Sequence, residues 1–342
     1  MKKILSLVMI LVLILVFALS GCSSATPTQS TTGDAEKSAF VSDASDEYYM
    51  VTFLSGYPFW KDCYAGFEDA AALYGAKTLY GGTTEYDINQ AVTALEQIIA
   101  KKPAGIAVTC MDADAYIEPI NKAIAAGIPI VVFDSDSPKS DRLVFIGTEN
   151  FAAGATAAKF IGEKMDGKGK VAAVTSLGQS NIAERTKGFE ETIKADFPGI
   201  ELVQIVDGGT DEVSAATNVA NLLTANPDID YLFCALVSAM TGSQTALAEK
   251  GLADKIKIVG MDTDDITLEG IQNGTVEATI SQAPWCEGFW AMNYLYYMAN
   301  GLIDPTGNGD WLEKGYPSIP VKANSGSTVV TKDNLAMFVK SK

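Results

Sequence analysis

Two aspartates directly follow apolar stretches that are typical of buried β-strands. Asp134 follows residues 131–133 and Asp262 follows residues 259–261, at an offset of 128 residues. Ligands of open α/β sheets bind just beyond the carboxyl ends of the strands. Carboxylates at these two positions could therefore accept hydrogen bonds from hydroxyl groups on opposite sides of one ligand. An aspartate after a strand can equally be a helix cap or a turn residue, so this alternative stays open.

Three further side chains could contact a polar ligand. Arg185 is one of two arginines, and its rigid fork suits paired oxygen atoms better than a lysine ammonium does. The alternative for Arg185 is a surface ion pair with Glu184 or Glu190. Phe59 and Trp60 are adjacent aromatic residues, and flat rings cover the C–H surface of a ligand while leaving its hydroxyls free. An aromatic pair beside a proline is more often part of a hydrophobic core.

The composition excludes several kinds of enzyme chemistry. The 342 residues include no histidine, which removes the usual general base, the usual zinc ligand and the Ser-His and Cys-His nucleophile pairs. The chain also lacks a Gly-x-Ser-x-Gly elbow and a P-loop, and Gly167-Lys168-Gly169 precedes a predicted strand instead of following one. The segment 262–265 has only the first residues of a calcium loop. We therefore expect no enzyme activity, no cofactor and no metal site.

The cysteines fit the same expectation. Apart from Cys22 they lack zinc-like spacing and have apolar neighbours, which favours buried thiols. These are Cys63, Cys110, Cys234 and Cys286.

The elements that would position these residues are strands alternating with amphipathic helices, the pattern of a parallel sheet covered on both faces. Strands are predicted at 49–53, 105–109, 128–133, 170–175, 231–235, 257–261 and 278–281. A helix is predicted after Asp87, which can cap it, and Pro103 follows the end of that helix. The fold class is therefore α/β.

A comparison of the chain with itself indicates two similar halves. At an offset of 124 residues, Asp87 aligns with Asp211 and Cys110 aligns with Cys234, and the apolar positions of the intervening helix also match. Two halves of this kind predict two doubly wound, Rossmann-like lobes with a ligand cleft between them. Any two α/β units share helix-then-strand spacing, which is the alternative explanation.

The N-terminus reads as an export signal. Lys2 and Lys3 precede an apolar run at 4–19, and the tetrapeptide 19–22 ends in Cys22 and looks like a lipobox. A plain membrane-spanning helix is the alternative, but the run is shorter than the roughly 20 residues that a span needs. We expect a signal peptide at 1–21, lipidation of Cys22 and a flexible linker through 46, with the membrane contacted through the lipid only.

Cleavage before Cys22 would remove two lysines and no acidic residue, so the formal net charge would change from −17 to −19. A field of this sign repels nucleic acid and disfavours anionic ligands. The expected location is therefore extracytoplasmic, at the membrane surface, without nucleic acid as a partner.

From about residue 47 to 301 the chain resembles the ribose-binding-like periplasmic proteins of sugar ABC transporters, in a lipoprotein form. The resemblance is carried by the order and spacing of several segments: Pro58-Phe59-Trp60, Ala126-Gly127-Ile128-Pro129, Phe133-Asp134, Gly147-Thr148-Glu149-Asn150, Glu184-Arg185, Gly188-Phe189, 222–228, Val259-Gly260-Met261-Asp262 and 278–282.

The resemblance implies the type I periplasmic-binding-protein architecture, two lobes joined by three crossovers that close over a monosaccharide by hinge motion. It places 47–150 and about 283–310 in an N-terminal lobe, and 151–282 and 311–342 in a C-terminal lobe. Ligand-binding positions follow from the family motif and its neighbours: Tyr57, Phe59, Trp60, Asp134, Asp136, Arg185, Asp262 and Gln282.

Three positions depart from the ribose-type pattern. Tyr57 stands where an asparagine is common, Ser135-Asp136 stand where an arginine follows the first aspartate, and Leu236-Val237 replace an Asn-Asp pair. The pocket should therefore be less polar than a ribose site. An Asp-Ser-Asp run also occurs in binding proteins for autoinducer-2, which keeps that furanosyl signal as an alternative ligand.

The sequence thus leads to one main functional hypothesis and two alternatives. The main one is a monomeric solute-binding lipoprotein that captures a sugar-like ligand and delivers it to an ABC permease without chemistry of its own. The first alternative is a receptor that presents a sugar or autoinducer-2 to a sensor or chemoreceptor. The second is a secreted α/β enzyme.

Overall fold

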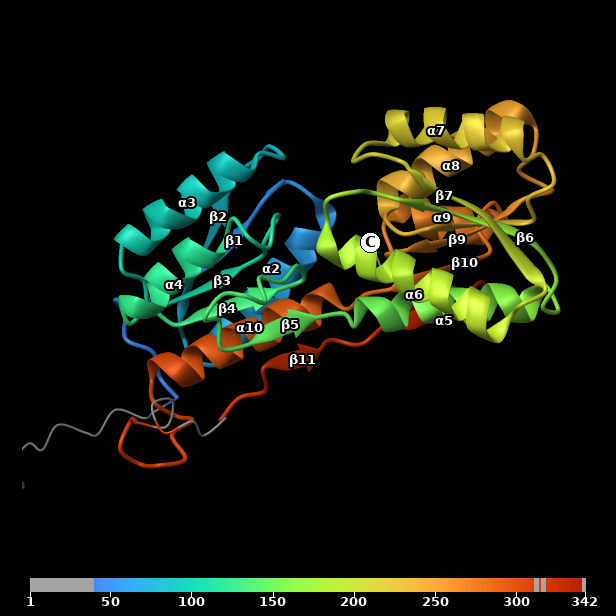
Figure 1. Cartoon of the computed structure of the whole chain (residues 1–342). Coiled ribbons are helices and arrows are strands. Elements are labelled where there is room, and N and C mark those ends of the chain that lie inside the picture. The colour runs from blue at the N-terminus through green and yellow to red at the C-terminus, as the bar shows by residue number, and fades with distance from the viewer. Residues whose placement is uncertain (1–39, 311–313, 315–317, 340–342) are drawn as a thin grey trace, which may run out of the picture. The chain divides into compact units, whose positions relative to one another are not determined.

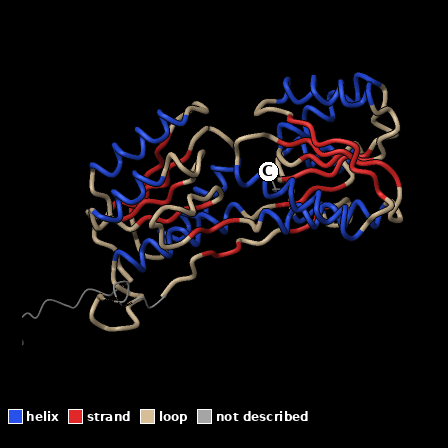
Figure 2. Tube along the Cα trace, viewed as in Figure 1, coloured by secondary structure: helices blue, strands red, loops and turns tan. Residues whose placement is uncertain are grey.

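The computed structural model describes residues 40–310, 314 and 318–339. Within these residues the chain forms two sheets, and we call each sheet with its helices a lobe. The predicted α/β fold of two parallel-sheet lobes is confirmed. Figure 2 shows strands with helices on both faces of each sheet.

The N-terminal lobe has strands in the order β11-β5-β4-β3-β1-β2, all paired in parallel. The strands are β1 (Glu47–Thr52), β2 (Lys77–Gly82), β3 (Gly105–Val108), β4 (Ile130–Phe133), β5 (Phe145–Gly147) and β11 (Lys322–Asn324). The helices of this lobe are α2 (Pro58–Ala72), α3 (Ile88–Ala100), α4 (Ile117–Ala125) and α10 (Pro284–Ala299).

The C-terminal lobe repeats this order as β12-β10-β9-β8-β6-β7, with β12 antiparallel to β10. The strands are β6 (Gly169–Thr175), β7 (Ile200–Asp207), β8 (Tyr231–Cys234), β9 (Lys257–Met261), β10 (Ala278–Ser281) and β12 (Thr328–Val330). The helices are α5 (Asn150–Lys164), α6 (Ser180–Asp196), α7 (Glu212–Ala225), α8 (Val237–Lys250) and α9 (Asp265–Asn273), followed by a 3-10 turn at Leu335–Met337. In Figure 1, α7 and α8 lie on one side of this sheet and α5 and α6 on the other.

The two sheets have equivalent strand orders, as the two similar halves of the sequence predict, but the edge strand β12 runs antiparallel to its neighbour where β11 runs parallel. The aligned aspartates are both helix caps: Asp87 accepts a hydrogen bond from the N–H of Gln90, and Asp211 accepts two from the N–H groups of Val213 and Ser214. Each cap satisfies backbone donors that the first turn of a helix leaves unpaired.

Close helix pairs cover the outer faces of the sheets. A Cβ on Gly288 of α10 would lie 1.7 Å from the carbonyl oxygen of Cys63 in α2, and one on Gly154 of α5 would lie 1.8 Å from that of Arg185 in α6. Only glycine permits these backbone approaches. The first contact packs α10 on the N-terminal lobe, where Leu295 and Tyr296 join its hydrophobic core. The second fixes α5 against α6, the helix that carries Arg185.

Three crossovers connect the sheets: residues 148–149 between β5 and α5, residues 282–283 between β10 and α10, and residues 325–327 between β11 and β12. One expected boundary differs. We expected all of 311–342 in the C-terminal lobe, but Lys322–Asn324 pairs with β5 in the N-terminal lobe before the chain crosses to β12. The reason is that the open edge of β5 offers free backbone groups to a returning segment.

Three of the four later cysteines are buried free thiols, as expected, and Cys286 is half-buried. The described residues contain no cluster of histidine, cysteine or acidic side chains suited to a metal ion. Nor does any helix among them have the length and apolarity to cross a bilayer. The expected signal peptide and Cys22 lie outside the described residues.

Candidate functional site

A cavity of about 440 Å³ lies at the carboxyl ends of the strands and is lined by residues from both lobes. An adjoining cavity of about 490 Å³ shares Tyr57, Phe59, Asp262 and Gln282 with it. This is where open α/β sheets bind ligands, and the volume falls in the range of small-molecule sites.

The two strand-end aspartates occupy equivalent places in this cavity. Asp134 follows β4 with φ 57° and Asp262 follows β9 with φ 72°. Their N–H groups donate to the carbonyl oxygens of Ile146 and Ile280, each 2.9 Å away, in or beside the next strand of the sheet. Positive φ is uncommon outside glycine, but aspartate tolerates it. The helix-cap interpretation is wrong for Asp262, because Asp264 caps α9.

Both carboxyl groups have a raised affinity for a proton. Burial, the largest cause, raises the pKa of Asp134 to about 7, while the positive charge of Arg185 lowers this pKa and the negative charge of Asp262 raises it. Burial likewise raises the pKa of Asp262, against the charge of Arg185 and a hydrogen bond from Gln282. Asp134 is 7% exposed. Burial raises the pKa of an acid because its charged form loses solvation, and a second acid nearby raises the pKa further by charge repulsion.

Arg185, in α6 of the C-terminal lobe, lines the same cavity as these carboxyl groups. It is 3% exposed, so the alternative of a surface ion pair with Glu184 or Glu190 is wrong. Its Nε donates to Asn150 Oδ1 at 2.6 Å, Nη1 to the carbonyl oxygen of Ala235 at 3.3 Å, and Nη2 to Gln282 Oε1 at 2.8 Å. A guanidinium has five N–H donors. Two of them therefore remain for a bound molecule.

Gln282 connects Arg185 to Asp262. Arginine is only a donor, so the Gln282 oxygen must face Arg185 and its NH₂ group must face Asp262. That NH₂ group donates to Asp262 Oδ1 at 2.6 Å. The result is a continuous chain of hydrogen bonds from Asn150 to Asp262 that fixes the direction of each side chain.

The aromatic wall of the cavity comes from the N-terminal lobe. The ring of Trp60 packs edge-on against Phe53, Phe59 and Phe133, with centroid distances of 5.3, 5.1 and 6.0 Å. Trp60 is 4% exposed, and its Nε1 has no hydrogen-bond partner among the described residues. Trp60 is thus part of the hydrophobic core and also lines the cavity. Its N–H is therefore an unsatisfied buried donor.

Three helices begin at the cavity without a side-chain cap. Their N-cap residues are Tyr57 for α2, Gln179 for α6 and Leu236 for α8, and all three line the cavity. The helices α3, α7 and α9, by contrast, each begin with a capping aspartate. An uncapped helix start presents backbone donors and the positive end of the helix dipole. The cavity therefore favours oxygen atoms as acceptors at these points.

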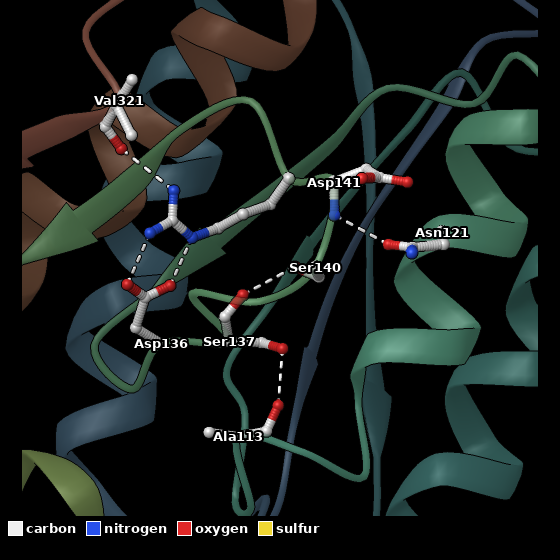
Figure 3. A network of polar contacts seen from close by, with 8 residues as sticks. Ala113, Asn121, Asp136, Ser137, Ser140, Asp141 and Val321 are labelled. Carbon is white, nitrogen blue, oxygen red and sulfur yellow. Dashed lines mark hydrogen bonds and ion pairs between the residues drawn. The ribbon is translucent and has the colours of Figure 1, made fainter.

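Asp136 is not brought to the cavity, and its prediction as a ligand contact is corrected. Its carboxylate, labelled in Figure 3, accepts hydrogen bonds from both Nε and Nη2 of Arg142, the second at 2.6 Å. Nη1 of Arg142 also donates to the carbonyl oxygen of Val321 at 3.1 Å. Arg142 lies six residues further along the same loop, and both carboxylate oxygens of Asp136 accept hydrogen bonds from it. The pair ties the β4–β5 loop to the segment before β11.

The same network shows why this loop is well fixed. Ser137 donates to the carbonyl oxygen of Ala113 at 2.6 Å, and Ser140 donates to that of Ser137 at 2.7 Å (Figure 3). The N–H of Asp141 donates to Asn121 Oδ1 at 2.7 Å. The loop thus supports Asp134 without reaching the ligand space itself.

Seven of the eight predicted ligand-binding residues line the cavity, and Asp136 is the exception. The sequence analysis missed Asn150, which holds Arg185, and Tyr86, Thr210 and Glu212, which line the outer part of the cavity. Asn150 lies in one of the family segments, and Tyr86, Thr210 and Glu212 flank the aligned helix caps. Their positions, in a family segment or next to an aligned helix cap, could have identified these four residues from the sequence.

Comparison with known proteins gives a consistent result. Residues 48–302 match the model of the periplasmic binding protein domain. The chain is 28% identical over 252 residues to the D-allose-binding periplasmic protein of Escherichia coli, which covers 70% of this chain and 80% of that protein.

Two solved structures are also similar. AraP, an arabinose binding protein from Geobacillus stearothermophilus, has a TM-score of 0.79 at 37% identity, covering 86% of this chain and 100% of that one. A sugar ABC transporter (sugar-binding protein) from Bacillus halodurans has a TM-score of 0.81 at 38% identity, with the same coverage. With two parallel-sheet lobes around a common cavity and a family model matched over most of its length, the chain belongs to the periplasmic binding protein domain family.

Proposed function

We propose that this protein is an extracytoplasmic, lipid-anchored binding protein that captures a neutral monosaccharide and delivers it to an ABC importer. The observation that carries the proposal is the convergence of Asp134, Asp262 and Arg185 on one aromatic-lined cavity. Carboxylates accept hydrogen bonds from sugar hydroxyls, the guanidinium donates to ring and hydroxyl oxygens, and the aromatic rings cover C–H surface.

The ligand class follows from charge and polarity. Two carboxyl groups and a net charge of −17 disfavour an anionic ligand. Tyr57, Leu236 and Val237 line the cavity and make it less polar than a ribose-type site. A neutral sugar satisfies the first condition, and a deoxy or methylated sugar would satisfy the second. The name of the Geobacillus relative makes arabinose the first sugar to test.

Titration calorimetry of the purified protein with pentoses, hexoses, polyols and autoinducer-2 tests this proposal. Arg185→Ala and Asp262→Ala should each weaken binding by about 2 kcal/mol or more, because ligand hydroxyls would be left unpaired. Product analysis after long incubation distinguishes a binding protein from the enzyme alternative. Absence of binding by every compound in the panel would rule out the sugar proposal, and wild-type affinity in Arg185→Ala would remove that residue from the site.

Lipid anchoring is a separate part of the proposal and rests on the N-terminal sequence. Metabolic labelling with a fatty-acid analogue should mark the wild-type protein and leave Cys22→Ala unlabelled. A wild-type protein that stays in the membrane fraction without label and with residues 1–21 still attached would favour the retained-helix alternative.

Delivery to an importer is distinguished from sensing by uptake. Deletion of the gene should abolish uptake of the labelled sugar at low concentration if the protein serves a permease. Loss of a sugar-dependent transcriptional response with normal uptake would favour the receptor alternative.

A further inference from the structure

Glu287 is a buried acid that does not line the ligand cavity described above. It lies in the first turn of α10 and is 0% exposed. Its Oε1 accepts a hydrogen bond from the hydroxyl of Ser325 at 3.0 Å, and its Oε2 has no hydrogen-bond partner among the described residues. No lysine or arginine of the described chain forms an ion pair with it. A buried carboxylate without a cation is costly.

The hydrogen bond of Glu287 links the segments that join the two lobes. Ser325 lies in the third crossover, and its N–H donates at 3.0 Å to the carbonyl oxygen of Gly147, where β5 ends and the first crossover begins. Glu287 itself follows the second crossover, and its N–H donates to the carbonyl oxygen of Ala283 at 3.1 Å. All three crossovers are therefore connected within a few hydrogen bonds. Hinge motion has to occur in these segments, so bonds between them restrain it.

The groups around Glu287 favour its neutral form. Burial is the largest cause that raises its pKa well above the usual value, and the charges of Asp134 and Asp262 raise it further. The charge of Arg185 and the hydrogen bond from Ser325 act in the opposite direction, as does the start of α10. The thiols of Cys63 in α2 and Cys286 in α10 also interact with it and offer no positive charge.

We propose that Glu287 is a neutral carboxylic acid that fastens the three crossovers and so positions the two lobes for closure over the ligand. Ionisation of Glu287 would place an unpaired charge in this buried site, where Asp134 and Asp262 repel it. This repulsion disturbs the packing of the crossovers, even though a carboxylate accepts the Ser325 hydrogen bond more strongly than a neutral acid does. The role in closure rests on the proposed sugar binding, whereas the neutral state of Glu287 does not.

The neutral state is tested without any ligand by thermal unfolding of the purified protein between pH 6 and 9.5. Glu287→Gln keeps the shape and the acceptor of the side chain and removes its titration. The melting temperature of Glu287→Gln minus that of wild type should grow with pH, reaching several degrees, because only wild type must take up a proton on folding to keep Glu287 neutral, and this uptake costs more as the pH rises. Glu191→Gln, an exposed position on α6, is the matched control and should follow wild type. Parallel curves for wild type and Glu287→Gln would overturn the proposal.

Infrared spectroscopy at pH 8 gives a second measurement. Wild type should show the carbonyl band of a protonated carboxylic acid, and Ser325→Ala should shift this band because it removes the hydrogen bond to Glu287. The absence of such a band in wild type would overturn the neutral state, and this holds even if Glu287→Gln does not fold.

The positioning role is tested by sugar affinity and small-angle scattering across the same pH range. Wild-type affinity should fall about tenfold above the ionisation of Glu287, whereas Glu287→Gln should lose this dependence. Ser325→Ala should shift ligand-free scattering toward a broader distribution of lobe separations. Equal pH profiles of affinity in wild type and Glu287→Gln would contradict the positioning role. A wild-type protein that binds no sugar at any pH would instead refute the proposed function, and the unfolding and infrared results would still decide the state of Glu287.

Discussion

Asn150 accepts a 2.6 Å hydrogen bond from Nε of Arg185, so the first residue of α5 sets the direction of a side chain that belongs to α6. The close approach of the two helices at Gly154 makes this possible, since it brings the backbone of Arg185 directly against α5. Asn150 also stands next to the first crossover. The residue that begins the C-terminal lobe therefore positions the cation of the ligand site.

Asn150→Ala should weaken sugar binding by about tenfold, because Arg185 loses the partner that orients its guanidinium. The ligand-free melting temperature should change little, since Arg185 keeps its bonds to Ala235 and Gln282. Calorimetry and thermal unfolding measure the two effects, and Lys159→Ala, an exposed change on the same helix, is the control. An equal loss of affinity in both variants would contradict the positioning role.

Asp134→Asn should make the ligand-free protein more stable at pH 8 and weaken its binding of sugar. The pKa of Asp134 is about 7 in the folded protein and near 4 in the unfolded chain, so wild-type stability is lost as the pH rises through this interval. The amide avoids this loss, which is on the order of a few kcal/mol. At pH 4 the two proteins should melt at similar temperatures. Thermal unfolding at both pH values checks the prediction, and a stability difference independent of pH would be evidence against it.

Trp60→Phe removes one buried N–H donor and also part of the ring volume that packs in the core. The ligand-free protein should be about 1–2 kcal/mol less stable than wild type, because removal of the unsatisfied donor offsets only part of the cost of the cavity. Sugar affinity should fall about fivefold to tenfold if the ligand accepts this hydrogen bond. Calorimetry with the best ligand of the panel measures the effect, and unchanged affinity would restrict Trp60 to packing.

Asp136→Asn should lower stability by about 1–3 kcal/mol and leave sugar affinity unchanged. The change breaks the pair with Arg142, whose side chain is 4% exposed and would lose its charged partner. Denaturant unfolding and calorimetry separate the two outcomes. A large loss of affinity with normal stability would return Asp136 to the ligand site.

Much of the fold could be predicted because its central strands are short apolar runs. β3, β4, β8 and β9 each lie inside their lobe and are almost fully buried, so their residues show no polar alternation. β2 and β7 were missed because they are edge strands with half-exposed side chains, and β2 ends in two glycines. Residues of β11 were placed in the wrong lobe because three residues carry too little pattern to show which sheet they join.

The ligand-site residues could be predicted where the residue type and its position in the sequence are together enough to indicate the role. Asp134 and Asp262 were identified because they end equivalent strands. The prediction of Asp136 as a ligand contact failed because its partner, Arg142, comes next to it only when the loop is folded. Asn150 was missed because a helix-initiating asparagine is common, and its contact with Arg185 depends on helix packing.

The three uncapped helix starts at the cavity bear on how this protein can diverge. Backbone N–H groups are kept by every substitution except one to proline, so the part of recognition that they supply persists when Tyr57, Gln179 or Leu236 is replaced by another residue type. In α2 the first helical residue, Pro58, contributes no donor. Each missing cap costs the empty protein roughly 1 kcal/mol of helix stability. An acceptor oxygen of a ligand recovers some of this energy whichever sugar carries it. Specificity can therefore drift through side chains at the cavity wall, while a basal affinity for polyhydroxyl compounds is retained by the main chain.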